Sequence, residues 1–486
     1  MTTEPVEYDV VVLGGGPAGE NIVDRTRAAG LSTALVESEL VGGECSYWAC
    51  IPSKALLRPV LARADARRVP GLAGSVTGPL DAEAVFAHRD YWTGDWKDGG
   101  QADWLDSIGA HLYRGHGRLY GIRKVAVTSP EGVHHVLSAR HAVVVATGTG
   151  PVLPDLPGLH GAGAWTSREA TSARHVPGRL LIVGGSVVAC EMATAWQALG
   201  SQVTVLVRGS GLLPRMEPFA GGLVAEALTA AGAVVRTGVA VEAVVRDGPT
   251  GPVTVVLEGG ELIEGDELLM ATGRAPRTED IGLDTVGLTP GDWIAVDESC
   301  RVAGHDWLYA VGDVNHRALL THQGKYQARI AGAAIAARAG RGTGAPAPAA
   351  APAPGTGRWG AYAATADTEA VPQAVFTDPE AAAVGLTLAE AERSGRRVRA
   401  VDYDLGKVSG AGLYADGYRG RARMVVDLDR EVLLGVTFVG SGAAELLHAA
   451  TVAVVGEVPI DRLWHAVPAF PTISEVWLRL LETYRG

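Results

Sequence analysis

The chain is poor in cysteine, in basic residues and in long apolar runs. Its 486 residues include four cysteines, too few for a scaffold of disulfide bonds. Lys and Arg number 42 against 54 Asp and Glu, so the net charge of -12 argues against nucleic acid or an anionic membrane as the main partner. No apolar stretch reaches bilayer length without a charge, Pro or Gly, and residues 1–8 are unlike a secretory signal. We therefore expect a cytoplasmic protein.

The rest of the composition is that of an ordinary globular protein, with 47% hydrophobic and 20% charged residues. The length predicts several domains, each with its own core. In a reducing compartment, two nearby cysteines indicate catalysis or metal binding rather than a structural bond. Cys45 and Cys50 are such a pair. We expect them to be catalytic, and we expect no metal site in the chain.

Residues 8–37 predict a dinucleotide-binding unit. Tyr8–Leu13 is predicted to be a buried strand, and Gly14, Gly16 and Gly19 follow it with GxGxxG spacing, opening a predicted helix. A second predicted strand ends at Glu37. In such a unit the glycines permit a tight turn, close approach to a pyrophosphate and packing of helix on strand, and the acid binds a ribose hydroxyl. Strand, spacing and acid together predict a bound dinucleotide.

The same pattern returns later in the chain. Leu180–Val183 is a predicted strand, Gly184–Ala189 the turn, and Val203–Val207 the second strand. A repeated unit predicts a second dinucleotide. The alternative is a degenerate unit that only packs, because Ser186 and Ala189 replace two glycines of the fingerprint.

The end of the second strand bears on the choice of nicotinamide. Where the first unit has Glu37, the second has Val207 followed by Arg208. A carboxylate there repels a 2′-phosphate, whereas an arginine binds it with charge-assisted hydrogen bonds. This favours NADPH over NADH. The alternative is that Arg208 is only a solvated residue at a strand end.

The two cysteines belong to the segment GGECSYWACIPSK at residues 42–54. This segment resembles the GGxCxxxxCIPSK signature of the pyridine nucleotide–disulfide oxidoreductases. The resemblance extends along nearly the whole chain, through Ala146–Thr149, Ala271–Pro276, Tyr309–Asp313, Phe376–Glu380 and Val384–Leu386.

The spacing of the pair places a physical demand on the backbone. Five residues along a regular helix rise about 7.5 Å, whereas a disulfide needs Cα atoms within roughly 7 Å. Joining Cys45 to Cys50 therefore requires a distorted first turn, which the preceding glycines and Trp48 in the loop allow. A helix N-terminus also favours a thiolate. The alternative is two unrelated buried thiols.

The resemblance implies specific roles. Cys45 would attack a substrate disulfide, and Cys50 would lie against the flavin as a thiolate. Lys54 and Glu191 would pair near the reacting nitrogen of the flavin, and Asp313 would hold its ribityl chain. The residues predicted to bind FAD and NADPH or NADH are Gly14, Gly16, Pro17, Ala18, Gly19, Glu37, Ser38, Gly43, Glu44, Lys54, Ala146, Thr147, Gly148, Gly184, Gly185, Ser186, Val187, Arg208, Gly273, Arg274, Gly312, Asp313, Leu320 and Thr321.

The C-terminal segment departs from the family pattern. Disulfide reductases of the family have HPTxSE, with the histidine as acid and base and the glutamate orienting it. Here the segment begins with Phe470 and ends with Glu475. A positioned base contributes about 10²–10⁴-fold to a proton transfer, and Phe470 supplies none. His465 lies five residues upstream and is either a substitute or a structural residue.

Three functions follow from this departure. The first is an FAD-dependent NAD(P)H oxidoreductase that passes electrons from NAD(P)H through FAD to a small acceptor such as a quinone, and the missing histidine favours it. The second is a dithiol–disulfide oxidoreductase in which water, His465 or the substrate takes the proton. The third is an FAD-binding protein without catalysis, against which the retained Cys45, Cys50, Lys54 and Glu191 speak.

The expected fold class is α/β, with two Rossmann-like dinucleotide-binding domains and a C-terminal α+β dimerisation domain. Residues 1–150 and 275–338 are predicted to form the FAD domain, and residues 151–274 the nicotinamide domain. The Ala-, Pro- and Gly-rich residues 339–369 are predicted to be a flexible linker without a core of their own. Residues 370–486 are predicted to build a homodimer and to place Phe470 and Glu475 against the cysteines of the other subunit.

Overall fold

The computed structural model describes residues 4–248, 250–341 and 357–486, and these form a mixed α/β structure. The chain divides into two compact units. Unit 1 consists of residues 1–50, 93–150 and 274–368, and unit 2 of residues 51–92, 151–273 and 369–486. These two units group the residues differently from the predicted domains, because residues 51–92 fall in unit 2 and not with the rest of residues 1–150, and residues 369–486 fall in unit 2 together with residues 151–273.

Unit 1 is built on a seven-stranded sheet in the order β3-β2-β1-β6-β5-β4, with β16 also paired to β6. The central strands are parallel to one another, whereas β5 is antiparallel to both β6 and β4. The strands are β1 (Val6–Leu13), β2 (Thr33–Glu37), β3 (His111–Arg114), β4 (His116–Leu119), β5 (Lys124–Thr128), β6 (His134–Val145) and β16 (Leu308–Ala310).

The strands of this sheet form because their apolar residues are buried on both faces. Val10–Leu13 and Val143–Val145 are almost completely shielded from solvent. Continuous apolar runs of this kind are typical of parallel strands covered on both sides. The predicted first strand, the helix after it and the second strand ending at Glu37 are confirmed.

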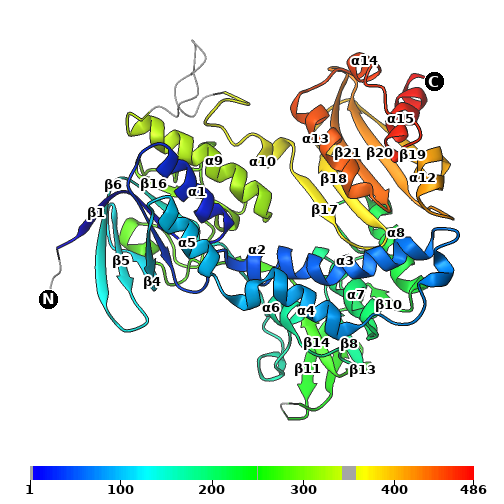
Figure 1. Cartoon of the computed structure of the whole chain (residues 1–486), viewed down its shortest axis with the longest axis horizontal. Coiled ribbons are helices and arrows are strands. Elements are labelled where there is room, and N and C mark those ends of the chain that lie inside the picture. The colour runs from blue at the N-terminus through cyan, green and yellow to red at the C-terminus, as the bar shows by residue number, and fades with distance from the viewer. Residues whose placement is uncertain (1–3, 249, 342–356) are drawn as a thin grey trace. The chain divides into compact units, whose positions relative to one another are not determined.

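Two helices of unit 1, α1 (Pro17–Ala28) and α9 (Thr321–Arg338), lie side by side (Figure 1). Small residues allow the close approach. A Cβ built on Gly332 would lie 2.7 Å from the Cβ of Arg25, and one on Gly324 would lie 3.4 Å from the Cβ of Ala18. The beginning of α9 is therefore held against the first turn of α1. The other helices of unit 1 are α2 (Gly43–Tyr47), α5 (Gly99–Ser107) and α10 (Ala366–Glu369).

The carboxyl ends of three parallel strands meet at one edge of the unit 1 sheet. Leu13 pairs with Val145, and Ala310 pairs with Val145 as well. The turns that follow these strands begin at Gly14, Ala146 and Val311 and so lie together. Open parallel sheets bind ligands at this edge.

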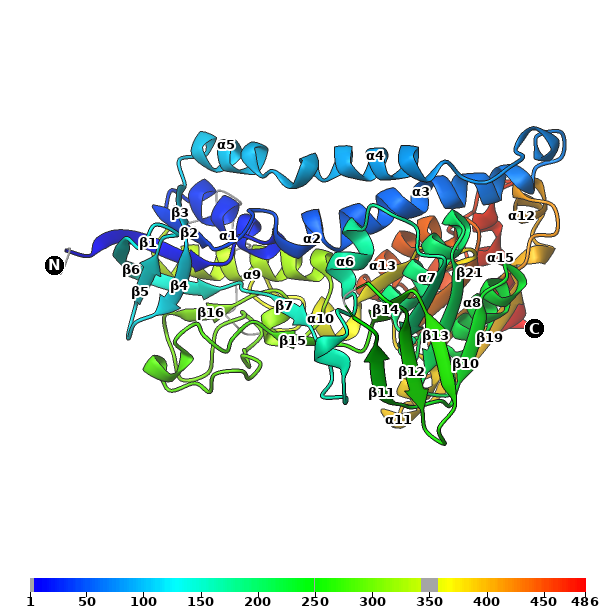
Figure 2. The same ribbon diagram turned by 90° about the horizontal axis from the view of Figure 1, so that it is seen from below.

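The first helices of unit 2 are α3 (Cys50–Arg67) and α4 (Ala82–Trp92), which are seen as two separate helices in Figure 2. Its first sheet is parallel, in the order β10-β9-β8-β14, and a three-stranded antiparallel sheet has the order β11-β12-β13. The second predicted strand–turn–helix–strand unit is confirmed as β8, α7 and β9. The elements are α6 (Ser167–Ser172), α7 (Val187–Leu199), α8 (Pro218–Ala230), β8 (Arg179–Val183), β9 (Gln202–Val207), β10 (Val234–Thr237), β11 (Val241–Arg246), β12 (Val253–Leu257), β13 (Leu262–Gly265) and β14 (Glu267–Met270).

The C-terminal part of unit 2 is an antiparallel five-stranded sheet in the order β17-β18-β21-β20-β19 with helices beside it. Its central strand β21 is buried along its whole length, which explains why the strand is apolar at both alternating positions. The elements are β17 (Pro372–Val375), β18 (Glu380–Gly385), β19 (Val398–Asp404), β20 (Arg421–Asp427), β21 (Val432–Gly440), α11 (Leu388–Arg393), α12 (Ser409–Tyr414), α13 (Leu447–Val455), α14 (Ile460–Leu463) and α15 (Val476–Arg485).

A short ribbon of β7 (Thr149–Pro151) and β15 (Arg274–Pro276) joins the chain where it leaves and re-enters unit 1. In the described part of the chain, no helix combines the length and apolarity that a membrane span requires.

The predicted linker differs from the structure near its end. Residues 342–356 lie outside the described residues, but residues 357–369 are packed. Ala364 is 2% exposed and belongs to the apolar core of unit 1, and its amide donates to the carbonyl oxygen of Glu298. The Gln323 amide donates to Asp367 over 3.0 Å. The prediction that 339–369 has no packed core is therefore corrected for its last residues, because small alanines there fit against α9.

Candidate active site

The turn after β1 is shaped by three glycines. Gly14 has φ +100°, and a Cβ built on it would lie 2.4 Å from the Ala146 carbonyl oxygen. A Cβ on Gly19 would lie 1.9 Å from the Gly14 carbonyl oxygen. At Gly16, by contrast, no atom lies within 4 Å of the Cβ position. The turn thus packs tightly on its inner side and is open in front of the α1 N-terminus, where backbone amides bind phosphate.

Glu37 is the last residue of β2 and lies beside this turn. Its Oε2 accepts a hydrogen bond from the Gly15 amide, and its Oε1 accepts one from the Glu39 amide, both over 2.6 Å. Burial raises the pKa of the carboxyl, and these backbone donors oppose the shift. The predicted ribose-binding acid therefore lies next to the glycine turn, as the fingerprint requires.

A polar cluster stands at the same sheet edge around Asp313. The Thr149 hydroxyl donates to Asp313 Oδ2 over 2.8 Å, and Arg274 Nε donates to Thr149 Oγ1 over 2.6 Å. Burial raises the pKa of Asp313, while the Thr149 hydrogen bond and the Arg274 charge lower it. Arg274 also lies 3.6 Å from Glu44, which pairs with Arg277 at 2.8 Å. Arg274, predicted as part of a nicotinamide-domain turn, is therefore found with Asp313 in unit 1.

These groups fit an FAD molecule. The open space before Gly16 suits a pyrophosphate, Glu37 suits a ribose, and Asp313 keeps Oδ1 outside the hydrogen bonds of the described residues.

The second glycine turn has the same inner packing. Gly184 has φ +132°, and a Cβ on it would lie 2.3 Å from the Ala271 carbonyl oxygen. Ala189 replaces the third glycine and is fully buried, so α7 accommodates a methyl group there. Arg208 is exposed just after β9, and no hydrogen bond or ion pair involves it within the described residues. Its guanidinium is therefore available for an anionic ligand.

The cysteine pair stands at a break between two helices. Cys45 is in α2, Cys50 begins α3, and Trp48 between them has φ -137°, outside the helical range. The departure from a regular helix that the spacing requires is thus present. The cysteines are not joined by a disulfide. Cys50 Sγ lies 3.3 Å from the Thr321 hydroxyl.

A hydrogen bond and burial favour the protonated form of Cys45. The Cys45 thiol hydrogen-bonds to Cys50, and this contact and burial raise the pKa of Cys45, whereas the Thr321 hydroxyl and the Lys325 charge act in the opposite direction. Cys50 stands at the first position of the 18-residue helix α3, where the helix dipole favours negative charge.

Two charged residues that influence groups of this unit were missed from the sequence, namely Glu20 on α1 and Lys325 on α9, whose charge acts on Cys45. Burial raises the pKa of Glu20 to about 7, the Lys325 charge lowers it, and Glu37 raises it. In the sequence both are ordinary charged residues. The signal available was spacing, because Lys325 follows Thr321 by four residues and shares its helix face.

Lys54 and Glu191 form an ion pair in unit 2. Lys54 Nζ lies 2.7 Å from Glu191 Oε2, and the Phe376 amide donates to Glu191 Oε1 over 3.1 Å. Glu191 is 3% exposed, so both carboxylate oxygens are satisfied away from water. Lys54 also stands 5.1 Å from the Phe376 ring centroid. The pair predicted from the sequence is therefore formed.

The C-terminal segment places Phe470 at the surface with 73% of its side chain exposed, and His465 is exposed as well. Glu475 is 5% exposed. Its Oε1 accepts from Arg479, while its Oε2 is buried without a hydrogen-bond partner within the described residues. The glutamate of the family pattern is thus retained with an unused oxygen.

The remaining predicted cofactor residues lie at the two glycine turns and at strand ends. Pro17 and Ala18 begin α1, Ser38 follows β2, and a Cβ on Gly43 would lie 2.8 Å from the Gly16 Cα. Those after strands or at helix starts are Thr147, Gly148, Gly185, Ser186, Val187, Gly273, Gly312 and Leu320.

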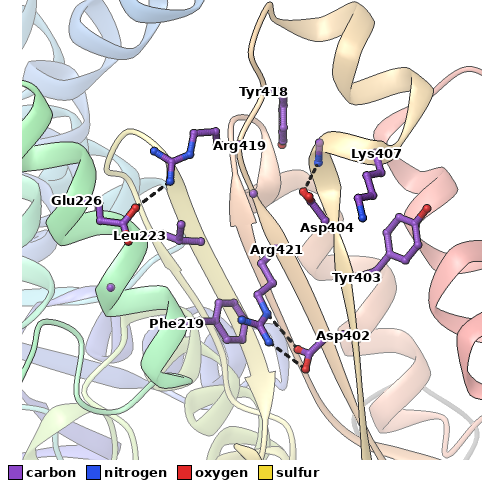
Figure 3. A pocket seen from close by; sticks show the side chains of 13 residues that line it. Phe219, Leu223, Glu226, Asp402, Tyr403, Asp404, Lys407, Tyr418, Arg419 and Arg421 are labelled. Carbon is purple, nitrogen blue, oxygen red and sulfur yellow. Dashed lines mark hydrogen bonds and ion pairs between the residues drawn. The ribbon is translucent and has the colours of Figure 1, made fainter.

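A separate hollow of about 680 Å³ lies in unit 2 between α8 and the strands β19 and β20 (Figure 3). Oppositely charged side chains of its lining form ion pairs. Arg419 pairs with Glu226 at 2.8 Å, and Arg421 pairs with Asp402 at 3.1 Å. None of the predicted site residues lines it.

The chain matches the family described as pyridine nucleotide-disulphide oxidoreductase over residues 8–340, and the dimerisation domain of the same family over residues 371–480. A dihydrolipoyl dehydrogenase from Thermus scotoductus is 31% identical, with 98% of this chain and 97% of the relative covered. A mercuric reductase from Staphylococcus aureus is 28% identical, with 96% and 81% covered.

Among solved structures, a Cu(II) complex of the HOCl-induced flavoprotein disulfide reductase RclA from Escherichia coli has a TM-score of 0.82 at 22% identity, with 98% of this chain and 99% of that chain covered. LpdA from Mycobacterium tuberculosis has a TM-score of 0.81 at 24% identity, with the same coverage. These likenesses show a shared fold and confirm the expected fold class.

The family match spans both glycine turns, the cysteine pair and the C-terminal sheet. The chain therefore belongs to the pyridine nucleotide-disulphide oxidoreductases and is a flavin-dependent oxidoreductase that uses FAD and NAD(P)H.

Proposed function

We propose that this enzyme takes electrons from NAD(P)H and delivers them to a small acceptor such as a quinone, with the Cys45 and Cys50 pair as a redox-active centre. The observation that carries the proposal is the combination of a complete dithiol site with an exposed phenylalanine, Phe470, at the position of the family's base. An acceptor that needs no proton from that position suits such a site. When bound, FAD supplies the two-electron exchange between the nicotinamide and its partners.

The residues of unit 1 hold the cofactor in this proposal. Gly14, Gly16 and Gly19 shape the pyrophosphate cradle, Glu37 binds the ribose, and Asp313 binds a hydroxyl of the ribityl chain. Thr149 donates to one oxygen of Asp313 and so leaves the other to accept from the ligand.

The dithiol is proposed to work with divided roles. Cys45 keeps its proton, since it hydrogen-bonds to Cys50 and is buried. Cys50 at the start of α3 then carries the negative charge of the pair and faces the flavin. Lys54 lies one helical turn beyond Cys50 on α3, about 6 Å along the axis. Glu191 fixes the Lys54 ammonium, and the pair is proposed to stand near the reacting nitrogen.

The second candidate function is dithiol–disulfide exchange. The intact pair beside Thr321 favours it, and so do relatives named dihydrolipoyl dehydrogenase. In this function Cys45 attacks the substrate disulfide, and Cys50 then displaces the product and closes the bond with Cys45. Water, His465 or the substrate takes the proton that the family's histidine otherwise carries.

The proposal includes NADPH as the donor and a homodimer as the working form. The exposed Arg208, without a partner in the described residues, supports NADPH. Exposed apolar side chains in the matched dimerisation domain support an interface, and they include Leu413, Val452, Val467 and Phe470. The dimer is proposed to place Phe470 and Glu475 against the partner's cysteines. The cytoplasmic location stays a prediction.

The test compares NADPH oxidation with a soluble quinone and with lipoamide, in the wild type and in Cys45→Ser and Cys50→Ser variants. Quinone turnover that exceeds lipoamide turnover supports the first function. A wild type that reduces lipoamide alone, with both serine variants inactive, supports the second instead. Quinone turnover that is unchanged in both serine variants would show that the cysteines take no part.

A further inference from the structure

Asp367 is a buried acid that contacts both the loop between β16 and α9 and the first turns of α9 itself. Its side chain is completely shielded from solvent. The Gln323 side-chain amide of α9 donates to Oδ1 over 3.0 Å, and Arg317 Nη1 in the loop lies 3.8 Å from Oδ2. Oδ2 has no hydrogen bond within the described residues. The Arg317 charge is therefore the group that compensates this oxygen.

The same face of α9 holds the beginning of the loop. Gln327 follows Gln323 by four residues and so lies one turn further along that face. Its Oε1 accepts hydrogen bonds from the Gly312 backbone amide and from the Asn315 side-chain amide, both over 2.8 Å. Gln327 and Asn315 are buried. These bonds fix the turn that contains Asp313, because Gly312 and Asn315 flank it.

The loop joins two positions of the candidate site, and all of these residues belong to unit 1. Asp313 lies near the start of the loop, where its Oδ2 accepts from the Thr149 hydroxyl over 2.8 Å. Thr321 follows the end of the loop, and its hydroxyl lies 3.3 Å from Cys50 Sγ. A different path of the loop would therefore move Asp313 relative to Thr321.

We infer that Asp367 is a positioning residue that fixes Asp313 relative to Thr321. It acts through Arg317 in the loop and through Gln323 on α9, and not by contact with the reacting groups. The signature at the cysteine pair assigns it no role. The inference rests on the proposed function, in which Asp313 binds the ribityl chain of FAD and Cys50 faces the flavin.

The contact with Arg317 requires a charged carboxyl. Burial raises the pKa of Asp367 to about 6, and the Arg317 charge is the strongest influence in the opposite direction. At about pH 8 the carboxyl is therefore ionised. Asp367→Asn keeps an oxygen for the Gln323 amide but removes the charge that faces Arg317. It leaves a guanidinium that is 20% exposed without its carboxylate.

The first measurement is the retention of FAD by the diluted holoenzyme at about pH 8, read by the fluorescence of the released flavin. We expect Asp367→Asn to weaken retention about tenfold, because a charge-assisted contact that orders the Asp313 turn is lost. Arg317→Gln removes the other member of the pair and should weaken retention in the same direction. The double variant should lose little more than Asp367→Asn alone, because both changes break the same pair.

The second measurement concerns the thiol end of the loop. After dithiothreitol has reduced the cysteine pair, a Cys50 thiolate against the oxidised flavin gives a long-wavelength charge-transfer absorbance. This absorbance depends on contact between the sulfur and the flavin ring. We expect Asp367→Asn to lower it roughly twofold per bound FAD, since sites of this kind depend on supports that hold them to about 0.5 Å. A role in stability alone would leave the absorbance per bound FAD unchanged.

Glu217→Gln is the matched control. Glu217 is 2% exposed and pairs with Arg423 over 2.9 Å in unit 2, so its replacement also breaks a buried ion pair. We expect this variant to have a lower Tm but wild-type FAD retention and wild-type absorbance. The inference is overturned if Asp367→Asn has wild-type values of both, or if both fall equally in Asp367→Asn and Glu217→Gln.

The wild-type holoenzyme separates this inference from the proposed function. If its dithiothreitol-reduced form lacks the charge-transfer absorbance, the proposed contact of Cys50 with the flavin fails, and FAD retention alone decides the role of Asp367. If the wild type has the absorbance and Asp367→Asn matches it in both measurements, the role of Asp367 fails alone. If Asp367→Asn does not fold, Arg317→Gln decides by the same two measurements, because the Arg317 side chain reaches the surface.

Discussion

A histidine restored at position 470 gives the sharpest distinction between the two candidate functions. Phe470 occupies the position of the family's acid–base histidine, and its side chain is 73% exposed. Glu475, which orients that histidine in the family pattern, keeps Oε2 buried and without a partner in the described residues. Phe470→His therefore restores the histidine of the family pattern in a chain that keeps the pattern's glutamate.

The expected gain in lipoamide turnover depends on the contacts that the structure provides for the new imidazole ring. A positioned base contributes about 10²–10⁴-fold to proton transfer. Glu475 also holds Arg479 through Oε1, so its charge is shared, and the exposed position gives the ring little packing. We therefore expect the lower end, roughly a 10²-fold rise in lipoamide turnover if proton transfer limits it. Quinone turnover should change by less than about threefold.

The assay is steady-state NADPH oxidation with lipoamide and with a quinone, in Phe470→His, Phe470→Leu and Phe470→His combined with Glu475→Gln. Only the first should gain lipoamide activity, with a bell-shaped pH profile. An equal gain in Phe470→Leu would show that size and not proton transfer matters. A Phe470→His variant with wild-type activity toward both acceptors would show that the missing base does not limit disulfide turnover.

Three further predictions follow from single side chains. Arg208→Gln should weaken NADPH binding about tenfold and leave NADH binding unchanged, because it removes a charge-assisted hydrogen bond to the 2′-phosphate. Fluorescence titration measures both affinities. Equal losses for the two nucleotides would contradict the assignment of Arg208 to the 2′-phosphate. Glu191→Ala should lower the free energy of unfolding by about 2–4 kcal/mol, since it leaves the Lys54 ammonium, 35% exposed, beside an apolar ring without its carboxylate partner. Thermal melting measures this loss. The double variant Lys54→Met/Glu191→Met should regain much of the lost stability. Gly16→Ala should fold but lose most of its FAD, because the added methyl fills open space before the α1 N-terminus, whereas Gly14→Ala should fail to fold stably. Circular dichroism measures the folding of the two variants, and flavin absorbance measures their bound FAD. A Gly16→Ala protein with full FAD would contradict the assignment of this turn as the pyrophosphate site.

The local parts of this fold were predictable because each is written in neighbouring residues. The strand–turn–helix unit ending at Glu37 depends on contacts within about thirty residues, and its later copy with Arg208 repeats them. The cysteine break was predictable from geometry, since two sulfurs five residues apart on a regular helix do not meet. The point at which the predicted linker ends and packed residues begin was not predictable. Ala364 looks like its flanking alanines in the sequence, and its burial depends on α9.

The charged and polar neighbours of the dithiol could not be predicted from the sequence for a related reason. Thr321 was expected near a cofactor, but its contact with Cys50 joins residues 271 positions apart. The Lys325 charge acts on Glu20 from a different helix, and α1 and α9 come close only because they pack through small residues. No local pattern marks such a pair, since a charge on a helix face is usually solvated. Arg274 likewise reaches Asp313 only through the folded sheet edge.

The Cys45 and Cys50 pair is expected to accept electrons that NADPH delivers. Anaerobic titration of the FAD-loaded enzyme with NADPH measures it directly, by the amount consumed before unreacted NADPH accumulates. With an oxidised pair, the wild type should consume one equivalent for FAD and a second for the disulfide, while Cys50→Ser should consume only the first. Equal consumption of a single equivalent by both proteins would contradict the account.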